Sequence, residues 1–185
     1  MGSLAARSSM APPMVAASTE VETKPMNEGP PPQATVRTAR PADSAAICRL
    51  VNAWADEGLT LRRTEEEIRV NSGEFVLAER PGYGPVACGA LAVFSPSLAE
   101  IRSVAVEPMA KGTGAGRSVM VFLLDVARTL EVDEVVLLTK VPGFFARFGF
   151  HPIEPGELPG PFMEEAIAGR GRTIQGRTIM IRSLL

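Results

Sequence analysis

A glycine-rich loop between an apolar segment and an amphipathic segment carries the clearest chemical signal in this sequence. Residues 103–129 read SVAVEPMAKGTGAGRSVMVFLLDVART, and glycines alternate with small residues between Lys111 and Gly116. Glycines allow successive backbone N–H groups to converge on one point, and the N-terminus of a following helix adds a partial positive charge. The pattern therefore predicts a strand, a loop and a helix that together bind a phosphate or a pyrophosphate.

The spacing of the glycines argues against two common phosphate loops. A Walker A loop requires Lys-Ser or Lys-Thr after its last glycine, whereas Arg117 and Ser118 stand there. A dinucleotide fingerprint requires G-x-G-x-x-G after the first strand, whereas this loop gives G-x-G-x-G late in the chain. The remaining pattern, a basic residue or Gln followed by x-x-G-x-G/A after V-x-P, resembles the acetyl-CoA loop of the GNAT acyltransferases. A glycine-rich turn without a ligand is the alternative.

Hydrophobic periodicity predicts the elements that position this loop. Apolar segments predict strands at residues 35–40, 75–79, 86–94, 98–106, 135–139, 150–153 and 177–183. Helical spacing predicts helices at residues 42–57, after the glycine loop and at 142–148, and Thr64 with Glu67 gives a capping-box signature for a further short helix. A hairpin precedes a strand–helix–strand unit, so we expect an α/β fold with a mixed sheet.

The composition limits the class of protein. With 185 residues, of which 45% are hydrophobic and 22% charged, the chain can bury one sizeable core. A net charge of −2 gives no reason to expect nucleic acid or a membrane surface as a partner. Cys48 and Cys88 lie in apolar segments, which is typical of reduced core thiols in a cytoplasmic protein.

The first 34 residues differ from the rest of the chain. They are rich in Ala, Pro, Ser, Met and Glu, show no hydrophobic period and contain a proline run. Such a segment cannot bury enough apolar surface to offset its ordering entropy, so we expect a disordered tail over residues 1–34. A transit peptide is the alternative, but Glu20, Glu22 and Glu28 argue against it. The folded domain is expected over residues 35–185.

Several short motifs beyond the loop resemble one branch of the GNAT superfamily. From about Val36 to Leu185 the sequence is similar to a GNAT domain, and most similar to the acetyltransferase domain of N-acetylglutamate synthase. The motifs that carry this resemblance are GLTLRRTEEEI, FVLAE, ACGAL, AEIRSVAVEP, VVLLT, FFARFGF and ELP. The resemblance implies a mixed, mostly antiparallel central sheet with a splayed strand pair and flanking helices.

The resemblance also implies where a co-substrate binds. Acetyl-CoA is expected, without a metal ion. The backbone beside the splayed strand would pair with the pantetheine arm, and the glycine loop would hold the pyrophosphate. The residues concerned are Val104, Ala105, Val106, Lys111, Gly112, Thr113, Gly114, Ala115 and Gly116.

Two residues take catalytic roles by resemblance. Glu100 matches the general base that removes a proton from the attacking amine, and Thr139 matches the hydroxyl that faces the departing sulfur. The structural alternatives are a solvent-exposed strand acid for Glu100 and a β-branched residue that merely suits a strand end for Thr139.

The resemblance implies L-glutamate as the acceptor. Arginine is the side chain that grips a carboxylate with two hydrogen bonds, and glutamate carries two carboxylates. Arg62 or, more favourably, Arg63 is expected to line the pocket with Ser103 and Arg177. Solvated arginines before a helix and along a terminal strand are the alternative.

Other functions stay open at this point. A GNAT enzyme for another small amine or a protein N-terminus is one alternative, and a non-catalytic CoA-binding module is another. A polyamine enzyme would need an acidic pocket, whereas the candidate pocket carries arginines. The chain has no room for the amino-acid-kinase-like domain of many such synthases, so we expect weak regulation by arginine or none. The sequence does not determine the oligomeric state, and a homodimer is left open.

Overall fold

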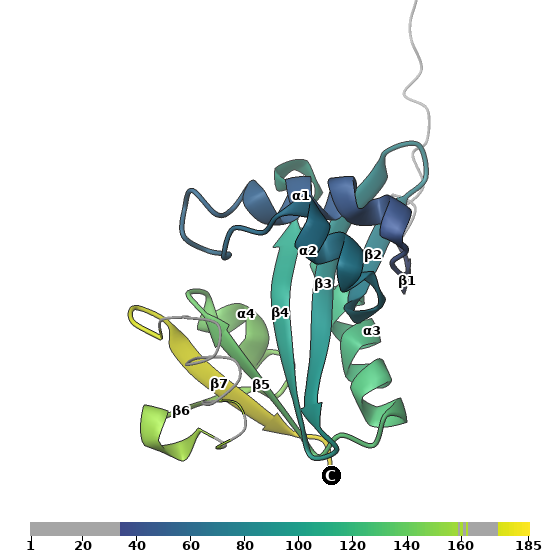
Figure 1. The fold of residues 1–185 in the computed structure, drawn as a ribbon. Coiled ribbons are helices and arrows are strands. Elements are labelled where there is room, and N and C mark those ends of the chain that lie inside the picture. Colours follow the sequence, from purple (N-terminus) through teal and green to yellow (C-terminus); the bar gives the residue numbers. More distant parts are fainter. Residues whose placement is uncertain (1–33, 159, 161, 163–173) are drawn as a thin grey trace, which may run out of the picture. The chain divides into compact units, whose positions relative to one another are not determined.

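The computed structural model describes residues 34–158, 160, 162 and 174–185 (Figure 1). The chain divides into two units, residues 1–30 and 31–185, and the first lies outside the described residues. The expectation of a disordered tail over residues 1–34 falls almost entirely on residues that are not described and stays a prediction. The second unit carries every feature discussed below.

The described residues form one seven-stranded sheet in the order β1-β2-β3-β4-β5-β7-β6. Neighbouring strands are antiparallel except for β4 and β5, which are parallel. The prediction of a mixed and mostly antiparallel α/β sheet is therefore confirmed. The strands are β1 (Thr35–Thr38), β2 (Phe75–Arg80), β3 (Gly84–Ser95), β4 (Leu98–Val106), β5 (Glu134–Thr139), β6 (His151–Ile153) and β7 (Thr178–Ser183).

Helices pack on both faces of the sheet because alternate strand residues face opposite sides. Leu77 of β2 joins the apolar cluster under α1 and α2, whereas its neighbours Val76 and Ala78 join the cluster under α3. The long helix α3 buries one apolar stripe, which includes Val119, Met120 and Leu123, against the sheet. The helices are α1 (Ser44–Asn52), α2 (Glu65–Val70), α3 (Ala115–Thr129) and α4 (Pro142–Ala146).

The first helix is shorter than predicted. We expected residues 42–57, but α1 ends at Asn52 and the chain continues in turns to Gly58. The Asn52 side chain explains the end of the helix, because its amide binds a later part of the chain instead of solvent. Its Nδ2 donates to the Arg63 carbonyl at 2.8 Å, and its Oδ1 accepts from the Arg63 N–H at 2.9 Å. A tertiary contact thus overrides the helical pattern.

The predicted capping box at the start of α2 is confirmed. Thr64 Oγ1 accepts from the Glu67 N–H at 3.2 Å, and Glu67 Oε2 accepts from the Thr64 N–H at 2.8 Å. These bonds satisfy backbone donors that a helix start leaves without partners. Residues 53–63, between α1 and this cap, are called the turn segment after α1. The cap fixes where this segment ends and α2 begins.

The parallel strands β4 and β5 separate soon after they meet (Figure 1). They pair only where Leu98–Glu100 faces Glu134–Val136, and β4 continues beyond this point without β5 as a neighbour. A bulge bends β4 where its register with β3 shifts, and Ser103 there has a φ of +54°. The predicted splayed strand pair is confirmed, and it opens one edge of β4.

No helix among the described residues is both long and apolar enough to cross a membrane.

Candidate active site

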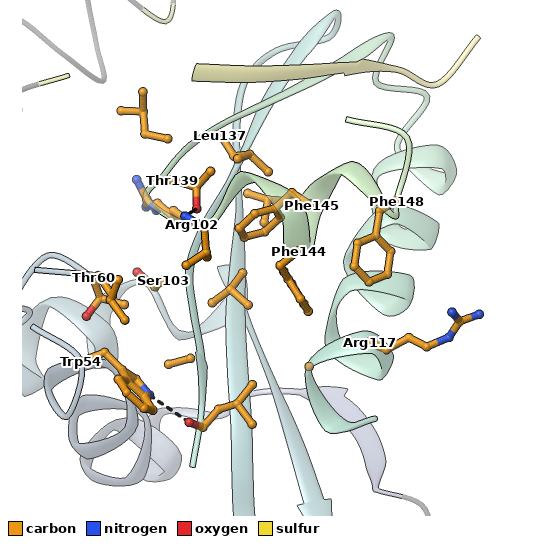
Figure 2. Close-up of a pocket in the computed structure, with 18 of the residues that line it drawn as sticks. Trp54, Thr60, Arg102, Ser103, Arg117, Leu137, Thr139, Phe144, Phe145 and Phe148 are labelled. Atoms are coloured by element: carbon orange, nitrogen blue, oxygen red, sulfur yellow. Dashed lines mark hydrogen bonds between the residues drawn. The ribbon is translucent and has the colours of Figure 1, made fainter. Parts of the chain in front are cut away.

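A cavity of about 570 Å³ lies where β4 and β5 separate. Figure 2 shows its lining, with Trp54 on one side, Phe144 and Phe148 on the other, and Thr139 and Arg102 toward the top of the view. Its walls come from β4, the end of β5, the glycine loop, the turn segment after α1, α4 and Arg177. The splay of the sheet therefore creates the space.

Most residues that the sequence singled out line this one cavity. Three do not: Arg62, Thr113 and Ala115. Thr113 lies in the loop with its Oγ1 donating to the Ala110 carbonyl at 2.7 Å, and Ala115 is buried at the start of α3. Those that line the cavity are Arg63, Glu100, Ser103, Val104, Ala105, Val106, Lys111, Gly112, Gly114, Gly116, Thr139 and Arg177.

The glycine loop leads into α3 with its backbone close to the cavity. Gly114 is the N-cap of α3 and has a φ of +89°, a conformation that side chains with a Cβ rarely adopt. A Cβ at Gly116 would lie 3.0 Å from Val106 Cγ2 and 3.5 Å from Phe144 Cζ, so the loop packs tightly between β4 and α4 at this residue. The start of α3, where backbone N–H groups lack partners within the helix, therefore lies at the wall of the cavity.

Trp54 joins the glycine loop to β4. Its indole Nε1 donates to the Val106 carbonyl at 2.9 Å, and the Lys111 ammonium lies 4.0 Å from its ring centre. We predicted that backbone groups around Val104–Val106 are free to pair with a ligand, but the Val106 carbonyl is occupied by Trp54. In the antiparallel ladder with β3, the Glu107 N–H bonds Val86, so the Val106 N–H points to the open edge. Nothing in the sequence indicated this role of Trp54.

The proposed base, Glu100, is a buried carboxylate and not an exposed strand acid. Its residue is 1% exposed, and Oε2 lies 3.7 Å from Nη1 of Arg102, whose side chain is 5% exposed. Arg102 also donates through Nη2 to the Glu74 carboxylate. Sequence reasoning missed Arg102, although its position two residues after Glu100 in a strand places both side chains on the same face. A buried ion pair thus holds the only acidic side chain among the described lining residues in place.

The two neighbouring arginines have different surroundings. Arg63 lines the cavity, and Asn52 holds its backbone through the two hydrogen bonds described above. Arg62 is exposed and forms an ion pair with Asp56 at the surface. Of the pair, Arg63 is therefore the residue that can meet a ligand in this cavity.

Arg177 lines the cavity but also has a structural role that the sequence did not indicate. Its Nη2 donates to the Gly58 carbonyl at 3.0 Å and its Nη1 to the Leu59 carbonyl at 3.3 Å. The guanidinium thus fastens the turn segment after α1 to the residues before β7. The guanidinium therefore brings a positive charge to the wall of the cavity while it holds this segment.

Thr139 ends β5 at the same part of the cavity. Its Oγ1 accepts a hydrogen bond from the Val141 N–H at 2.9 Å, and the residue is 4% exposed. A hydroxyl that accepts in this way still has its own proton to donate. The bond orients the hydroxyl beside the gap between the separated strands.

The cavity therefore has an anion cradle at one end and a carboxylate with arginines at the other. Glu100 is the only acidic side chain among the described residues that line it, beside five arginines and Lys111. No group of three potential metal ligands occurs among the described residues. The arrangement suits a long ligand with phosphates at one end and a proton transfer at the other.

Comparison with known proteins identifies the family. Residues 40–150 match the Acetyltransferase (GNAT) family. The chain is 43% identical over 132 residues to the amino-acid acetyltransferase of Mycobacterium tuberculosis, which covers 70% of this chain and 75% of that protein.

Two solved structures have similar folds. Rv2747 from Mycobacterium tuberculosis, in complex with CoA and NLQ, superposes with a TM-score of 0.73 at 34% identity and covers 82% of this chain and 99% of its own. N-acetylglutamate synthase from Neisseria gonorrhoeae, complexed with coenzyme A and N-acetyl-glutamate, gives a TM-score of 0.73 at 27% identity, over 82% of this chain and 35% of its own. The family match includes the glycine loop and both splayed strands, and the chain belongs to the GNAT acetyltransferase family.

Proposed function

We propose that the chain transfers the acetyl group of acetyl-CoA to the α-amine of L-glutamate. The observation that carries the proposal is that one cavity joins the glycine loop, the buried Glu100 and Arg63. The similarity to an amino-acid acetyltransferase and to a synthase solved with coenzyme A and N-acetyl-glutamate supports the same reaction.

The co-substrate is proposed to lie along the open edge of β4. Its pyrophosphate would accept hydrogen bonds from the first turn of α3, where Gly114 and Gly116 let the backbone approach. The Lys111 ammonium beside Trp54 adds a positive charge at this end. The Val106 N–H, which points to the open edge, would pair with the pantetheine arm or the thioester oxygen.

The reaction is then an attack by an amine on a thioester. The amine nitrogen bonds to the carbonyl carbon, the C–S bond breaks, and CoA leaves as a thiolate. Glu100 accepts the amine proton directly or through a water, and the Thr139 hydroxyl faces the departing sulfur as its hydrogen-bond donor. Backbone N–H groups of β4 stabilise the negative charge on the carbonyl oxygen.

The acceptor is proposed to be an anion because the lining of its end of the cavity is basic. Arg63 would bind one carboxylate with two N–H groups, and Arg177 both holds the turn segment after α1 and adds charge. A polyamine would instead need several carboxylates, and Glu100 is the only acidic residue among the described lining residues. The charge of the cavity thus disfavours the alternative of a cationic acceptor.

The proposal is tested by measuring CoA release from acetyl-CoA with a panel of acceptors. L-glutamate, L-glutamine, L-aspartate, L-leucine and spermidine are compared at equal concentration with the full chain. We expect the highest kcat/KM with glutamate. A kcat/KM with leucine or spermidine equal to that with glutamate would contradict the assignment. A higher kcat/KM with glutamine than with glutamate would show that glutamine is the acceptor.

A glycine variant tests the placement of the co-substrate. Acetyl-CoA should raise the Tm of the wild type, since a ligand that binds only the folded state stabilises it. Gly114→Val should abolish this rise, because a Cβ at a φ of +89° displaces the backbone that meets the pyrophosphate. Thermal unfolding with and without acetyl-CoA measures both effects.

Gly82→Val is the matched control. Gly82 has a similar φ of +79° but lies in the turn between β2 and β3, away from the cavity. Both variants should lose stability, and only Gly114→Val should lose the rise in Tm. An equal rise in both variants would place the co-substrate elsewhere.

A further inference from the structure

A second, smaller hollow of about 290 Å³ runs along α3, from Arg117 near its start to Arg128 near its end. Four arginines line it, together with Val121, Leu124, Phe148 and Gly149. Two of the arginines lie on α3, one at the end of α4 and one on β7. We call it the arginine hollow; its arginines are Arg117, Arg128, Arg147 and Arg182.

The arginines line one hollow because of their spacing and packing. Arg117 and Arg128 lie eleven residues apart on α3, about three helical turns, so both face the same side. Arg182 reaches this side from β7, where its Nη1 donates to the Phe148 carbonyl. Arg147 lies at the end of α4 with its guanidinium 5.3 Å from the Phe144 ring centre.

The positive charge of the hollow is only partly balanced by the residues around it. No acidic side chain lines it among the described residues, and Asp125, next along α3, pairs with Arg128 at 2.7 Å. Burial, and after it the charge of Arg128, lowers the pKa of Arg182. Like charges held together on a chain whose net charge is −2 indicate a site for an anion.

The hollow adjoins the anion cradle of the main cavity. Arg117, Arg147 and Phe148 line both spaces. Figure 2 shows Arg117 and Phe148 together at the side of the cavity opposite Trp54. The Phe144 ring, which lies beside Arg147, is also close to the glycine loop. Its Cζ would lie 3.5 Å from a Cβ at Gly116. A group bound in the hollow would therefore lie next to a pyrophosphate on the loop.

We propose that the arginine hollow binds the 3′-phosphate of acetyl-CoA. This inference rests on the proposed placement of the pyrophosphate on the glycine loop. In CoA the 3′-phosphate is carried by the ribose that is esterified to the pyrophosphate, so both anions must lie close together. A phosphate monoester has close to two negative charges at neutral pH and three acceptor oxygens, which suit several planar guanidinium groups. The chain thereby distinguishes CoA from its dephosphorylated precursor.

Calorimetric titration of the full chain with CoA and with 3′-dephospho-CoA tests the proposal. The wild type should bind CoA roughly ten- to a hundredfold more tightly than dephospho-CoA, as expected for hydrogen bonds between charged groups. Arg117→Gln and Arg147→Gln should each weaken CoA binding by about tenfold and weaken the binding of dephospho-CoA much less. Both residues are exposed, so these variants keep the fold, which the Tm checks.

Arg69→Gln is the control for the loss of one positive charge. Arg69 lies exposed on α2, where it pairs with Glu66, and it lines neither space. It should leave the affinity for both ligands unchanged. Arg147→Lys should keep part of the preference for CoA, because it retains the charge without the planar fork.

Several results would overturn the proposal. Equal affinity of the wild type for both ligands would do so, as would an equal loss for both ligands in Arg117→Gln and Arg147→Gln. Binding of inorganic phosphate that depends on these arginines, without a preference for CoA, would assign the hollow to a free anion instead. If the inference fails and the proposed function holds, acetyl-dephospho-CoA supports acetyl transfer as well as acetyl-CoA does. If neither nucleotide binds the wild type, both proposals fall.

Discussion

Replacing Glu100 by Gln should lower kcat by roughly 10²- to 10⁴-fold and leave the affinity for acetyl-CoA close to that of the wild type. Glu100 is buried at the end of the cavity away from the glycine loop, so the variant changes the proton acceptor and not the phosphate site. Gln keeps the size of the side chain, and Arg102 loses a charged neighbour. Steady-state kinetics with a parallel titration of CoA measures both quantities.

The pH dependence of the same variant separates a base from a structural residue. A base is needed while the amine is protonated, so the deficit of Glu100→Gln should shrink as pH rises and free amine becomes abundant. A structural defect would persist at every pH. Unchanged turnover at neutral pH would remove Glu100 from the mechanism.

Glu74→Gln is the matched control for the ion pair. Glu74 is the second carboxylate that contacts Arg102, but it does not line the cavity. Its loss should reduce stability and change kcat by no more than a few-fold. An equal drop in kcat for both variants would mean that the charge balance around Arg102, and not proton transfer by Glu100, controls turnover.

Arg63→Ala should raise the KM for glutamate roughly ten- to a hundredfold, the cost of about 1.5–3 kcal/mol for a lost hydrogen bond to a charged group. The KM for acetyl-CoA should stay unchanged, since Arg63 lies on the turn segment after α1 and not on the glycine loop. Arg63→Lys should restore only part of the affinity, because Lys offers a point charge. Initial rates at varied glutamate and fixed acetyl-CoA measure these values.

The adjacent Arg62 supplies the control for Arg63→Ala. Arg62→Ala removes the same charge one residue away, but Arg62 is exposed and paired with Asp56, so the KM for glutamate should hardly change. Equal effects of the two variants would show that only the long-range charge matters and that the pocket is assigned wrongly.

Arg177→Ala should act differently from Arg63→Ala. Arg177 holds the Gly58 and Leu59 carbonyls, so its loss should lower the Tm and raise the KM for glutamate together. Arg63→Ala should leave the Tm within a few degrees of the wild type. If neither arginine variant changes the KM, the enzyme could still acetylate glutamate, but through other residues.

The elements of this fold were predictable because their signals are local. The glycine spacing, the Thr64–Glu67 cap and the apolar period of each strand lie within short windows of sequence. The separation of β4 from β5 came from the family resemblance. The end of α1 was predicted wrongly because it depends on Asn52 meeting Arg63, eleven residues later.

The candidate site was predictable only in part, for the same reason. Arg102, Asn52 and Trp54 were missed because their roles depend on partners far along the chain or in the folded space. Trp54 and the Val106 carbonyl, for example, are 52 residues apart. Arg63 was favoured over Arg62 only through the family resemblance, since the directions of adjacent side chains in a turn depend on the local backbone geometry.

Trp54 is the sole tryptophan of the chain, and its indole lies between the Lys111 ammonium and the Val106 carbonyl at the cavity. Ultraviolet light at the long-wavelength edge of protein absorption therefore excites a single side chain, which lies beside the glycine loop. A phosphate that draws the Lys111 ammonium away from the Trp54 ring would change the electric field at the indole. The wavelength and the intensity of its fluorescence would then change. If acetyl-CoA binds the glycine loop as proposed, the emission of Trp54 should therefore report its binding without a dye or a tag.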